Sequence, residues 1–478
     1  MSDPRDQRIA ELESRVAAQD AQLSAKDGEI AALKQKVEEL THLVLLLKER
    51  LDRSSGNSSK PPSSDSPGQR AERRGKGATG GKRGGQPGHS GSKRGLLPPA
   101  QVNEFKPLFP RKCENCLSPL PETSDAVQRY QTVDLPVLKA HVIEWVRHRV
   151  ACPSCRHKTW ASIASIPATP FGPRVEAVVG LVTGVYHLSR RVAVSLMSDI
   201  LGIDISLGAV SAVEERVSEA TKLPVDEAWT KTDEAAVKHT DGTSWYQAGV
   251  LCALWTIATS AVTVFKILTD GKAATLAPLF GKKLGILVSD RATALNFWAM
   301  EKRQVCWAHL LRKAISFSER DGPAGAIGRE LLDYITIIFR HWDGLKDGTL
   351  TRDEFRELMA PVRLRVEALL ERAATAKVPH VSGSCEDILQ HRAALWTFVD
   401  QEGVEPTNNH AERELRAFVL WRKRSFGTQS KRGNLYAERL MTVAHTARKQ
   451  KKNVLEFLTA CCAAARTGAT PPSLFAAA

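Results

Sequence analysis

The feature that most constrains this chain is an apolar repeat of seven residues near its N-terminus. Every seventh position in residues 9–51 is apolar, and so are four of the six positions of a second series, three residues further on. The first series is Ile9, Val16, Leu23, Ile30, Val37, Val44 and Leu51, and the second is Leu12, Gln19, Lys26, Leu33, Leu40 and Leu47. β-Branched residues in the first series with Leu in the second favour a parallel two-stranded coiled coil. We therefore expect residues 1–53 to form a coiled coil that makes the chain a homo-oligomer, the alternative being an amphipathic helix packed on the chain itself.

The net charge of the chain indicates which class of partner it binds. Its 478 residues carry a formal net charge of +14, and a chain of this length usually forms about three domains. A basic surface gains free energy by releasing counterions from phosphates, so nucleic acid is the favoured partner and an anionic membrane the second. No apolar secretory signal follows the charged N-terminus, and we expect a cytoplasmic protein.

Residues 54–100 are rich in Ser, Gly, Pro and basic residues and have no periodicity. Between Ser54 and Gly95 there are nine Lys or Arg against two Asp or Glu. Such a composition cannot bury a core, and it predicts a basic flexible linker. The linker can follow a phosphate backbone or serve as a solvated spacer, and composition does not separate the two.

Two Cys-x-x-Cys pairs lie in residues 101–166. The pairs are Cys113 with Cys116 and Cys152 with Cys155. Four thiolates satisfy tetrahedral Zn²⁺, and each pair places two sulfurs on one side of the ion. Because Tyr130–Val150 alternates like strands, we predict a zinc-ribbon-like module with one structural Zn²⁺, the alternatives being a redox pair or chance spacing.

Residues 167–232 have helical periodicity. Leu188–Gly202 and Ser206–Ala220 are amphipathic segments around a Gly-containing turn, which is the outline of a helix-turn-helix. Two ordinary core helices explain the pattern equally well, because Glu214 and Glu215 of the second segment would repel phosphates.

The pattern changes to strands from residue 233. The uncharged stretch Gly242–Phe265 is long enough to cross a membrane, but its Thr, Ser and β-branched residues favour two strands and no membrane contact. The predicted elements are strands at Ala236–Thr240 and within Gly242–Phe265 around a turn at Ala258–Ala261, a helix near Ala273–Phe280, a strand at Leu284–Ser289, and helices at Gln304–Phe317, Glu330–Arg340 and Arg352–Ala376. This order predicts a ribonuclease H-like α/β core over residues 233–317 and 405–458, with a helical insertion at 318–404 and a C-terminal tail at 459–478.

Carboxylates follow two of these strands. Asp241 closes the first and Asp290 closes the strand that ends at Ser289, so both can lie at neighbouring strand ends. Each carboxylate alone is more typical of a solvated turn. A helix predicted to begin at Asn408 adds Glu412 and Glu414, which lie two residues apart and point to different helix faces, so only one can join a shared site.

Four sequence runs accompany these carboxylates. They are Asp241-Gly-Thr, Ser289-Asp290, Cys306-Trp-Ala-His309-Leu-Leu-Arg312, and Asn408-Asn-His-Ala-Glu-Arg-Glu-Leu-Arg416. Together they resemble the insertion-sequence sixty-six group of bacterial transposases, also called the TnpC type. The resemblance covers nearly the whole chain, because that group also has an N-terminal coiled coil, a Ser-Ser-Lys-Pro-Pro linker, here Ser58–Pro62, and a zinc-finger-like module.

The resemblance implies a DDE-type transposase, a polynucleotidyl transferase that cleaves insertion-sequence ends and joins 3′ hydroxyls to target DNA. It maps the catalytic triad onto Asp241, Asp290 and Glu412, with Glu414 as a surface residue. In-line attack on a phosphodiester accumulates negative charge, and we expect the three carboxylates to hold two Mg²⁺ or Mn²⁺ ions that stabilise it. The residues expected to hold the DNA backbone are Arg413, Arg416, Arg422, Lys423 and Arg424.

The resemblance also implies nucleoid association and partners, namely transposon ends, target DNA and small accessory proteins of the same element. Two motifs depart from the family, whose members often carry Asp-Glu-Thr where this chain has Asp241-Gly242-Thr243, and Asp-Gly where it has Asp290-Arg291.

Cys306 and His309 could join a metal site, but two lone ligands on an apolar helix are more typical of packing, and the role of His309 stays open. The alternatives to an active transposase are a catalytically inactive zinc and coiled-coil DNA-binding protein and a ribonuclease H-like nuclease without strand transfer.

Overall fold

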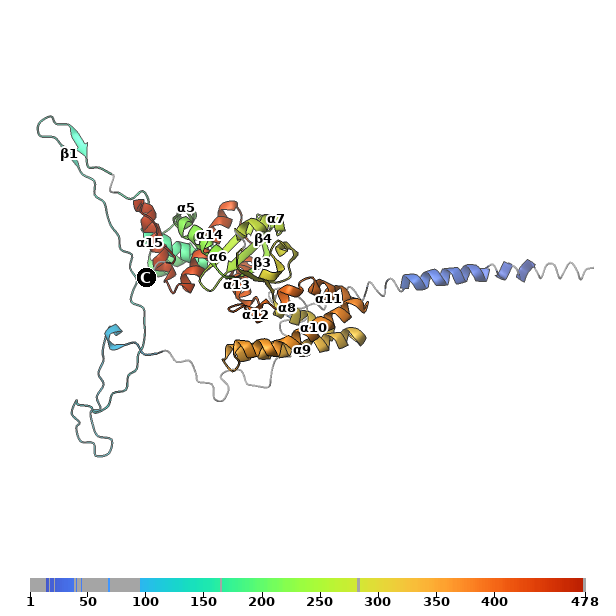
Figure 1. The fold of residues 1–478 in the computed structure, drawn as a ribbon. Helices are drawn as coiled ribbons and strands as arrows, with labels where there is room; N and C mark the ends of the chain where they lie inside the picture. Colours follow the sequence, from blue (N-terminus) through green and yellow to red (C-terminus); the bar gives the residue numbers. More distant parts are fainter. Residues whose placement is uncertain are drawn as a thin grey trace, which may run out of the picture. The chain divides into compact units, whose positions relative to one another are not determined.

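The computed structural model of the chain describes residues 14–16, 18–20, 22–37, 40, 44, 68, 95–163, 166–281 and 284–475. Residues 22–37 form a helix, drawn in blue in Figure 1, and its side chains are exposed, Leu23 and Leu33 among them. The heptad repeat is therefore helical where it is described, and its pairing with a second copy stays a prediction. Most of the predicted basic linker lies outside the described residues.

The chain divides into two compact units. One combines residues 1–76 with 231–427, and we call residues 231–427 the sheet unit. The other combines residues 77–230 with 428–478, and we call it the helical unit. None of the helices in the described part of the chain is both long and apolar enough to cross a membrane.

A five-stranded sheet with the order β5-β4-β3-β6-β7 organises the sheet unit (Figure 1). Its strands are β3 (Val237–Gln247), β4 (Val250–Ala258), β5 (Thr263–Leu268), β6 (Ile286–Ser289) and β7 (Arg303–Val305). β4 pairs antiparallel with β3 and β5, whereas β6 pairs parallel with β3 and β7. The stretch Gly242–Phe265 thus forms strands, as predicted, although β3 continues beyond its expected end to a tight turn at Ala248 and Gly249.

Helices α7 and α13 lie in the same unit. α7 (Ala273–Leu276) continues as a short 3₁₀ helix, which confirms the helix expected there. α13 (Asn409–Ser425) packs on β3 and β4. Its Phe418 ring lies 5.4 Å from the Trp245 ring of β3 and 4.9 Å from the Phe265 ring of β5, so aromatic packing fixes this helix to the sheet.

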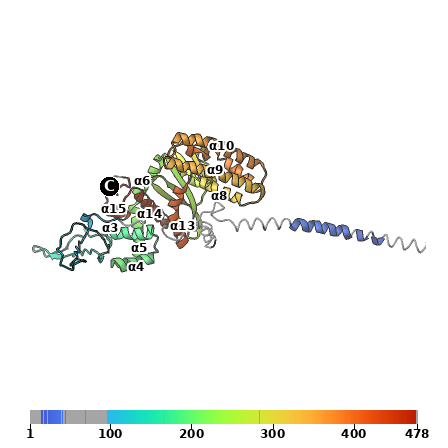
Figure 2. The same cartoon turned by 90° about the horizontal axis from the view of Figure 1, so that it is seen from below.

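The segment predicted as a helical insertion is helical. Its helices are α9 (Gly322–Lys346), α10 (Arg352–Thr375), α11 (Ser382–Leu389) and α12 (Thr397–Asp400), and they follow α8 (Trp307–Ser318). α9 and α10 lie side by side, as Figure 2 also shows from below. Their apolar faces share one core with Val288 of β6 and Val305 of β7, so the insertion is packed on the sheet.

Strand β7 is missing from the sequence prediction, which assigns Gln304 to a helix; this is wrong, because α8 begins only at Trp307. Arg303 is fully buried in β7. Its guanidinium donates hydrogen bonds to the carbonyl oxygen of Asp290 at 3.0 Å and to Oδ1 of Asn296 at 3.2 Å. A three-residue strand with two buried polar side chains has no apolar alternation from which it could be predicted.

The helical unit contains the two predicted amphipathic segments. Its helices are α3 (Pro173–Gly180), α4 (Arg190–Leu201), α5 (Leu207–Ala220), most of α6 (Lys222–Glu234), α14 (Lys431–Lys449) and α15 (Val454–Thr467), and a π-helical turn η3 (Leu181–Val185) follows α3. Gly202 ends α4 in the left-handed conformation, and Ser206 Oγ caps α5 by accepting the Ala209 N–H at 3.1 Å. The predicted turn between two helices is therefore confirmed.

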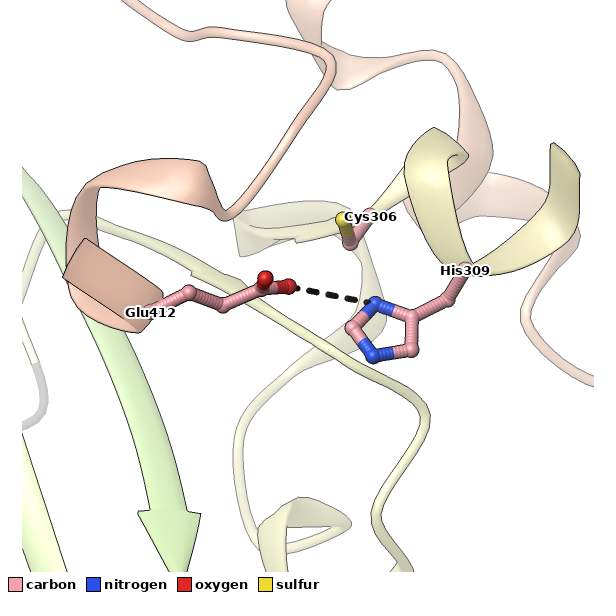
Figure 3. A group of neighbouring side chains, drawn as sticks. All are labelled: Cys306, His309 and Glu412. Carbon is pink, nitrogen blue, oxygen red and sulfur yellow. Dashed lines mark ion pairs between the residues drawn. The ribbon is translucent and has the colours of Figure 1, made fainter. Parts of the chain in front are cut away.

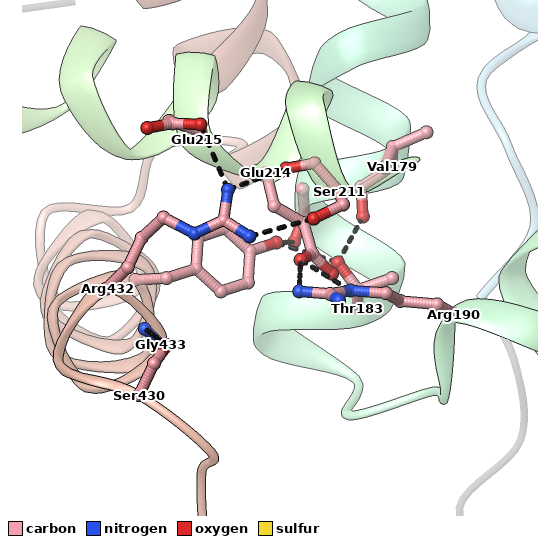
Figure 4. A network of polar contacts seen from close by, with 11 residues as sticks. Val179, Thr183, Arg190, Ser211, Glu214, Glu215, Ser430, Arg432 and Gly433 are labelled. Carbon is pink, nitrogen blue, oxygen red and sulfur yellow. Dashed lines mark hydrogen bonds and ion pairs between the residues drawn. The ribbon is translucent and has the colours of Figure 1, made fainter. Parts of the chain in front are cut away.

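Glu214 and Glu215 are neutralised in this unit (Figure 4). Arg190 donates to Glu214 at 2.6 Å, and Arg432 donates to Glu215 at 3.0 Å. α5 packs against α3, α4, α14 and α15, which makes it a core helix of the unit. Reading of DNA by α5 stays a prediction.

The predicted C-terminal tail is wrong for residues 459–467, because they belong to α15, which packs against α3 and α5.

The cysteine-containing segment also differs from its prediction. Of Tyr130–Val150, only residues 149 and 150 belong to a strand, in the short hairpin of β1 (Arg149–Ala151) and β2 (Lys158–Trp160). Most of this segment is exposed, so no apolar core holds the expected longer strands.

Candidate active site

Asp241 lies within β3 and does not close it, which corrects the sequence prediction. The strand continues because β3 pairs with β4 as far as Gln247, whereas its parallel pairing with β6 ends at His239 and Val288. Asp241 and Asp290 each lie two residues beyond that last parallel pair. Strand register thus brings both carboxylates to the same edge of the parallel pairing, as expected.

The Asp290 side chain is oriented by its own turn. Its Oδ1 accepts the backbone N–H of Ala292 at 2.9 Å, and its carbonyl oxygen accepts the buried guanidinium of Arg303. Burial lowers the pKa of Arg303 to about 10, and Asp290 opposes this change. Arg303 is a positioning residue that the sequence analysis missed.

Glu412 reaches the site from the first turn of α13. The fully buried Asn408 fixes the start of this helix, because its side-chain amide donates to the Thr240 carbonyl of β3 at 2.7 Å. Its backbone N–H lies 3.1 Å from the Cys306 sulfur, and Trp307 N–H donates to the Pro406 carbonyl at 2.8 Å. These contacts bring together segments that lie about a hundred residues or more apart in the chain.

The three carboxylates interact electrostatically. Burial, Asp290 and Glu412 raise the pKa of Asp241 to about 8, although the Gly242 N–H and Arg312 oppose the change. Burial raises the pKa of Glu412, Arg312 lowers it, and Asp290 raises it. The site therefore concentrates more negative charge than its own residues neutralise.

Glu414 is not a surface residue, contrary to expectation. Its side chain is 15% exposed and lies 3.6 Å from His410 Nε2, whose ring lies 5.0 Å from that of His239 on β3. The charges of Asp290 and Glu412 both raise the pKa of Asp241. The position of Glu414 beside His410 favours Glu412 as the third carboxylate.

A pocket of about 450 Å³ opens beside the two aspartates. It is lined by Asp241, Gly242, Thr243, Ser244, Leu251, Cys252, Ala253, Trp255, Thr269, Asp270, Gly271, Asp290 and Ala292. A larger pocket of about 620 Å³, lined by residues of α8, α9 and the turn after α9, holds none of the predicted site residues. We regard the smaller pocket as the candidate site because Asp241 and Asp290 line it.

The five predicted DNA-contacting residues divide into two groups. Arg413, Arg416, Lys423 and Arg424 are exposed on α13. Arg422 instead donates hydrogen bonds to the Ser244 carbonyl and, at 3.0 Å, to Thr243 Oγ1, so it ties α13 to β3. Its assignment as a contact to the DNA backbone is not supported by this geometry.

The two cysteine pairs each lie in a tight turn. The Cys113 carbonyl accepts the Leu117 N–H at 2.9 Å, and the Cys152 carbonyl accepts the Arg156 N–H at 2.9 Å. Leu117 and Arg156 share the left-handed conformation, with φ of 59° and 60°. Hydrogen bonds from Ser118 lower the pKa of Cys116 to about 7, and those from Cys155 and Ser154 lower the pKa of Cys152.

The four cysteines do not converge. Among the described residues, the group of three or more potential ligands whose atoms lie within 4.8 Å of one another consists of Cys306, His309 and Glu412 (Figure 3). The sequence analysis favoured packing for Cys306 and His309, and it missed Glu412 as their neighbour. Burial, then Arg312, lowers the pKa of His309 to about 4, and burial raises that of Cys306 to about 11.

Comparison with known proteins agrees with the motifs. A family of unknown function, DUF6444, matches residues 1–95. No curated protein matches the chain. The family described as Transposase IS66 family matches residues 175–435, more than half of the chain and all of the residues of the carboxylate site. The chain belongs to the IS66 family of transposases.

Proposed function

We propose that the chain is a DDE-type transposase that binds insertion-sequence ends, cleaves them and joins the 3′ hydroxyls to target DNA. The observation that carries this proposal is the convergence of Asp241, Asp290 and Glu412 from a strand, a strand end and a helix. The order and directions of the five strands support a ribonuclease H-like core for this site. Membership of a transposase family supports DNA as the substrate.

The carboxylates fit hard divalent cations. Mg²⁺ and Mn²⁺ prefer carboxylate oxygens; Asp241 and Asp290 line the pocket, and Glu412 is near enough to raise the pKa of Asp241. The raised pKa of Asp241 indicates that ionising all three groups is unfavourable without added positive charge. When bound at Asp241, Asp290 and Glu412, two such ions would activate the attacking oxygen and stabilise the leaving oxygen.

The chain itself supplies the geometry. β3 fixes Asp241 in the sheet, the Ala292 N–H orients Asp290, and Asn408 fixes the helix that carries Glu412. Gly242, which lines the pocket, leaves room beside Asp241 for the Trp255 indole of β4. The exposed basic residues of α13 are suited to hold the phosphate backbone, a role that weakens with salt.

The N-terminal half would promote self-association and hold a structural zinc module. The exposed apolar residues of the helix at 22–37 support self-association through the coiled coil. The two cysteine turns direct N–H groups toward sulfur, which suits thiolate ligands of one structural Zn²⁺. The family resemblance adds small accessory proteins of the same element to the proposed partners.

The test compares four substitutions in the full chain, assayed with Mg²⁺ on DNA that carries the ends of its insertion sequence. Asp241→Asn, Asp290→Asn and Glu412→Gln should each abolish end cleavage and strand joining while binding to the ends persists. Glu414→Gln is the matched control and should remain active. An active Glu412→Gln protein beside an inactive Glu414→Gln protein would transfer the role to Glu414.

Product analysis separates the proposal from its alternatives. A wild-type protein that releases cut ends and never joins them would be a nuclease. A wild-type protein that binds the ends without cutting them would be an inactive DNA-binding protein. Either outcome overturns the proposed reaction, and activity in all four variants would overturn the two-metal site.

A further inference from the structure

A second group of ligand atoms lies beside the carboxylate pocket. The Cys306 sulfur, a ring nitrogen of His309 and a carboxylate oxygen of Glu412 all lie within 4.8 Å of one another (Figure 3). His309 Nδ1 is 3.8 Å from Glu412 Oε1, too far for a hydrogen bond. Both atoms are buried and have no hydrogen-bond partner among the described residues. Buried polar atoms without partners are rare and indicate a missing interaction.

The spacing of these atoms suits one shared ion. Tetrahedral Zn²⁺ holds nitrogen and oxygen ligands at about 2.1 Å, which separates them by roughly 3.4 Å. The observed 3.8 Å needs only a small side-chain adjustment. Thiolate and imidazole ligands select Zn²⁺ over Mg²⁺, which prefers oxygen alone. The ligand set therefore differs in kind from the three carboxylates.

The chain holds these ligands from two helix starts. Cys306 is the N-cap of α8 and His309 lies in its first turn, while Glu412 lies in the first turn of α13. Helix N-termini stabilise anionic side chains, here a thiolate and a carboxylate. The backbone N–H of Asn408 points at the Cys306 sulfur at 3.1 Å and would stabilise a thiolate once a cation binds, against the burial that otherwise keeps Cys306 protonated.

We propose that Cys306, His309 and Glu412 form a zinc site that competes with the carboxylate site for Glu412. The competition rests on the proposed function, whereas binding of zinc does not. One thiolate and one carboxylate balance the charge of Zn²⁺. Arg312, 3.9 Å from Glu412, then no longer neutralises Glu412 and interacts mainly with the charge of Asp241. Zinc bound here withdraws Glu412 from Asp241 and Asp290 and inhibits end cleavage.

The first test measures zinc in the full chain, loaded from a zinc buffer and then desalted. Cys306→Ser and His309→Ala should each hold one Zn²⁺ per chain fewer than the wild type. The difference is independent of how many ions Cys113, Cys116, Cys152 and Cys155 hold. Cys385→Ser is the matched control, since Cys385 is also a buried cysteine of the sheet unit and should lose no zinc. Equal zinc content in the wild type and both site variants would overturn the site.

Cobalt provides a second measurement if Cys306→Ser fails to fold. The Co²⁺-loaded wild type should show a thiolate-to-cobalt absorption band that is stronger than in His309→Ala and in Glu412→Gln. Identical spectra in these three proteins would also overturn the site. Because neither readout needs DNA or Mg²⁺, a chain without transposase activity still tests the zinc site.

The competition is measured with Mg²⁺-dependent cleavage. Zinc should inhibit the wild type, and the zinc concentration that halves the rate should rise about tenfold or more in His309→Ala, relative to that variant's own uninhibited rate. Inhibition that is unchanged in His309→Ala, together with the loss of one zinc ion, would overturn the competition for Glu412.

Discussion

The carboxylate site and the two cysteine turns are both candidate metal sites, but the chain builds them in opposite ways. The carboxylates come from distant segments and are brought together by strand register, a buried amide and aromatic packing. The cysteines come as local pairs whose turns form separately, in a segment that is mostly exposed. The first site can fold without a metal, whereas the second would need a bound metal to join its halves.

Zinc removal should have the largest effect and should be confined to the cysteine segment. Chelation should abolish amide protection at residues 113–117 and 152–160, because the turns and the hairpin lack a core of their own. Protection in β3 and α13 should not change. Hydrogen exchange with mass spectrometry measures both regions in one sample. Cysteine turns that stay protected in chelator would mean that both sites are built by folding alone.

Asn408→Leu tests whether packing alone assembles the carboxylate site. The variant cannot donate to the buried Thr240 carbonyl, so it should lose about 1–3 kcal/mol of unfolding free energy. Cleavage should fall about 100-fold, because the helix that carries Glu412 loses its fixed start. The exposed Asn409 offers the control, and Asn409→Leu should keep both properties. Unchanged cleavage in Asn408→Leu would mean that α13 is fixed by its aromatic contacts alone.

The metal-free carboxylate site should destabilise the protein as the pH rises. The pKa of Asp241 is raised from 3.8 to about 8 in the folded chain, so between these values the folded state retains a proton that the unfolded state has lost. The stability contributed by the protonated form is complete below about pH 4 and is lost as the pH rises through about 8.

Calorimetry in chelator measures this effect through the melting temperature. Asp241→Asn should melt at a higher temperature than the wild type at pH 8, and the gap should close toward pH 4. Added Mg²⁺ at pH 8 should raise the melting temperature of the wild type more than that of the variant. Parallel pH profiles for the two proteins would contradict the electrostatic coupling.

The smallest expected effects are on stability and on the salt dependence of DNA binding, and they distinguish Arg422 from the exposed Arg424. Arg422→Ala should cost about 1 kcal/mol of stability or less, through its lost hydrogen bonds to Ser244 and Thr243, and should leave the salt dependence of DNA binding unchanged. Arg424→Ala should keep stability and lower the salt slope of binding by about one ion. The reverse pattern would restore Arg422 as a phosphate contact.

The sequence predicted those parts of the site that depend on local pattern. The strand pattern predicted that Asp241 and Asp290 lie near neighbouring strand ends, which agrees with the β3–β6 register. The sequence also predicted the helix that carries Glu412. The choice between Glu412 and Glu414 could not come from the residues, because helix geometry only separates their faces. The position of His410 beside Glu414 favours Glu412, and the substitutions of both residues test that choice.

Other parts depend on tertiary contacts between distant segments. Buried Arg303 has the composition of a surface residue and is explained only by the carbonyl and amide oxygens around it. The approach of Glu412 to Cys306 and His309 depends on how the chain returns from the helical insertion to Pro406. No periodicity or spacing encodes such a return.

Gly242 has a consequence for how this family can vary. It lies directly across from Trp255 on β4, and a Cβ at Gly242 would lie 2.9 Å from the Trp255 ring. The Asp-Gly-Thr run of this chain is therefore coupled to an indole on the neighbouring strand. A larger residue at position 242 requires the Trp255 ring to shift or to be replaced, so positions 242 and 255 should covary across the family.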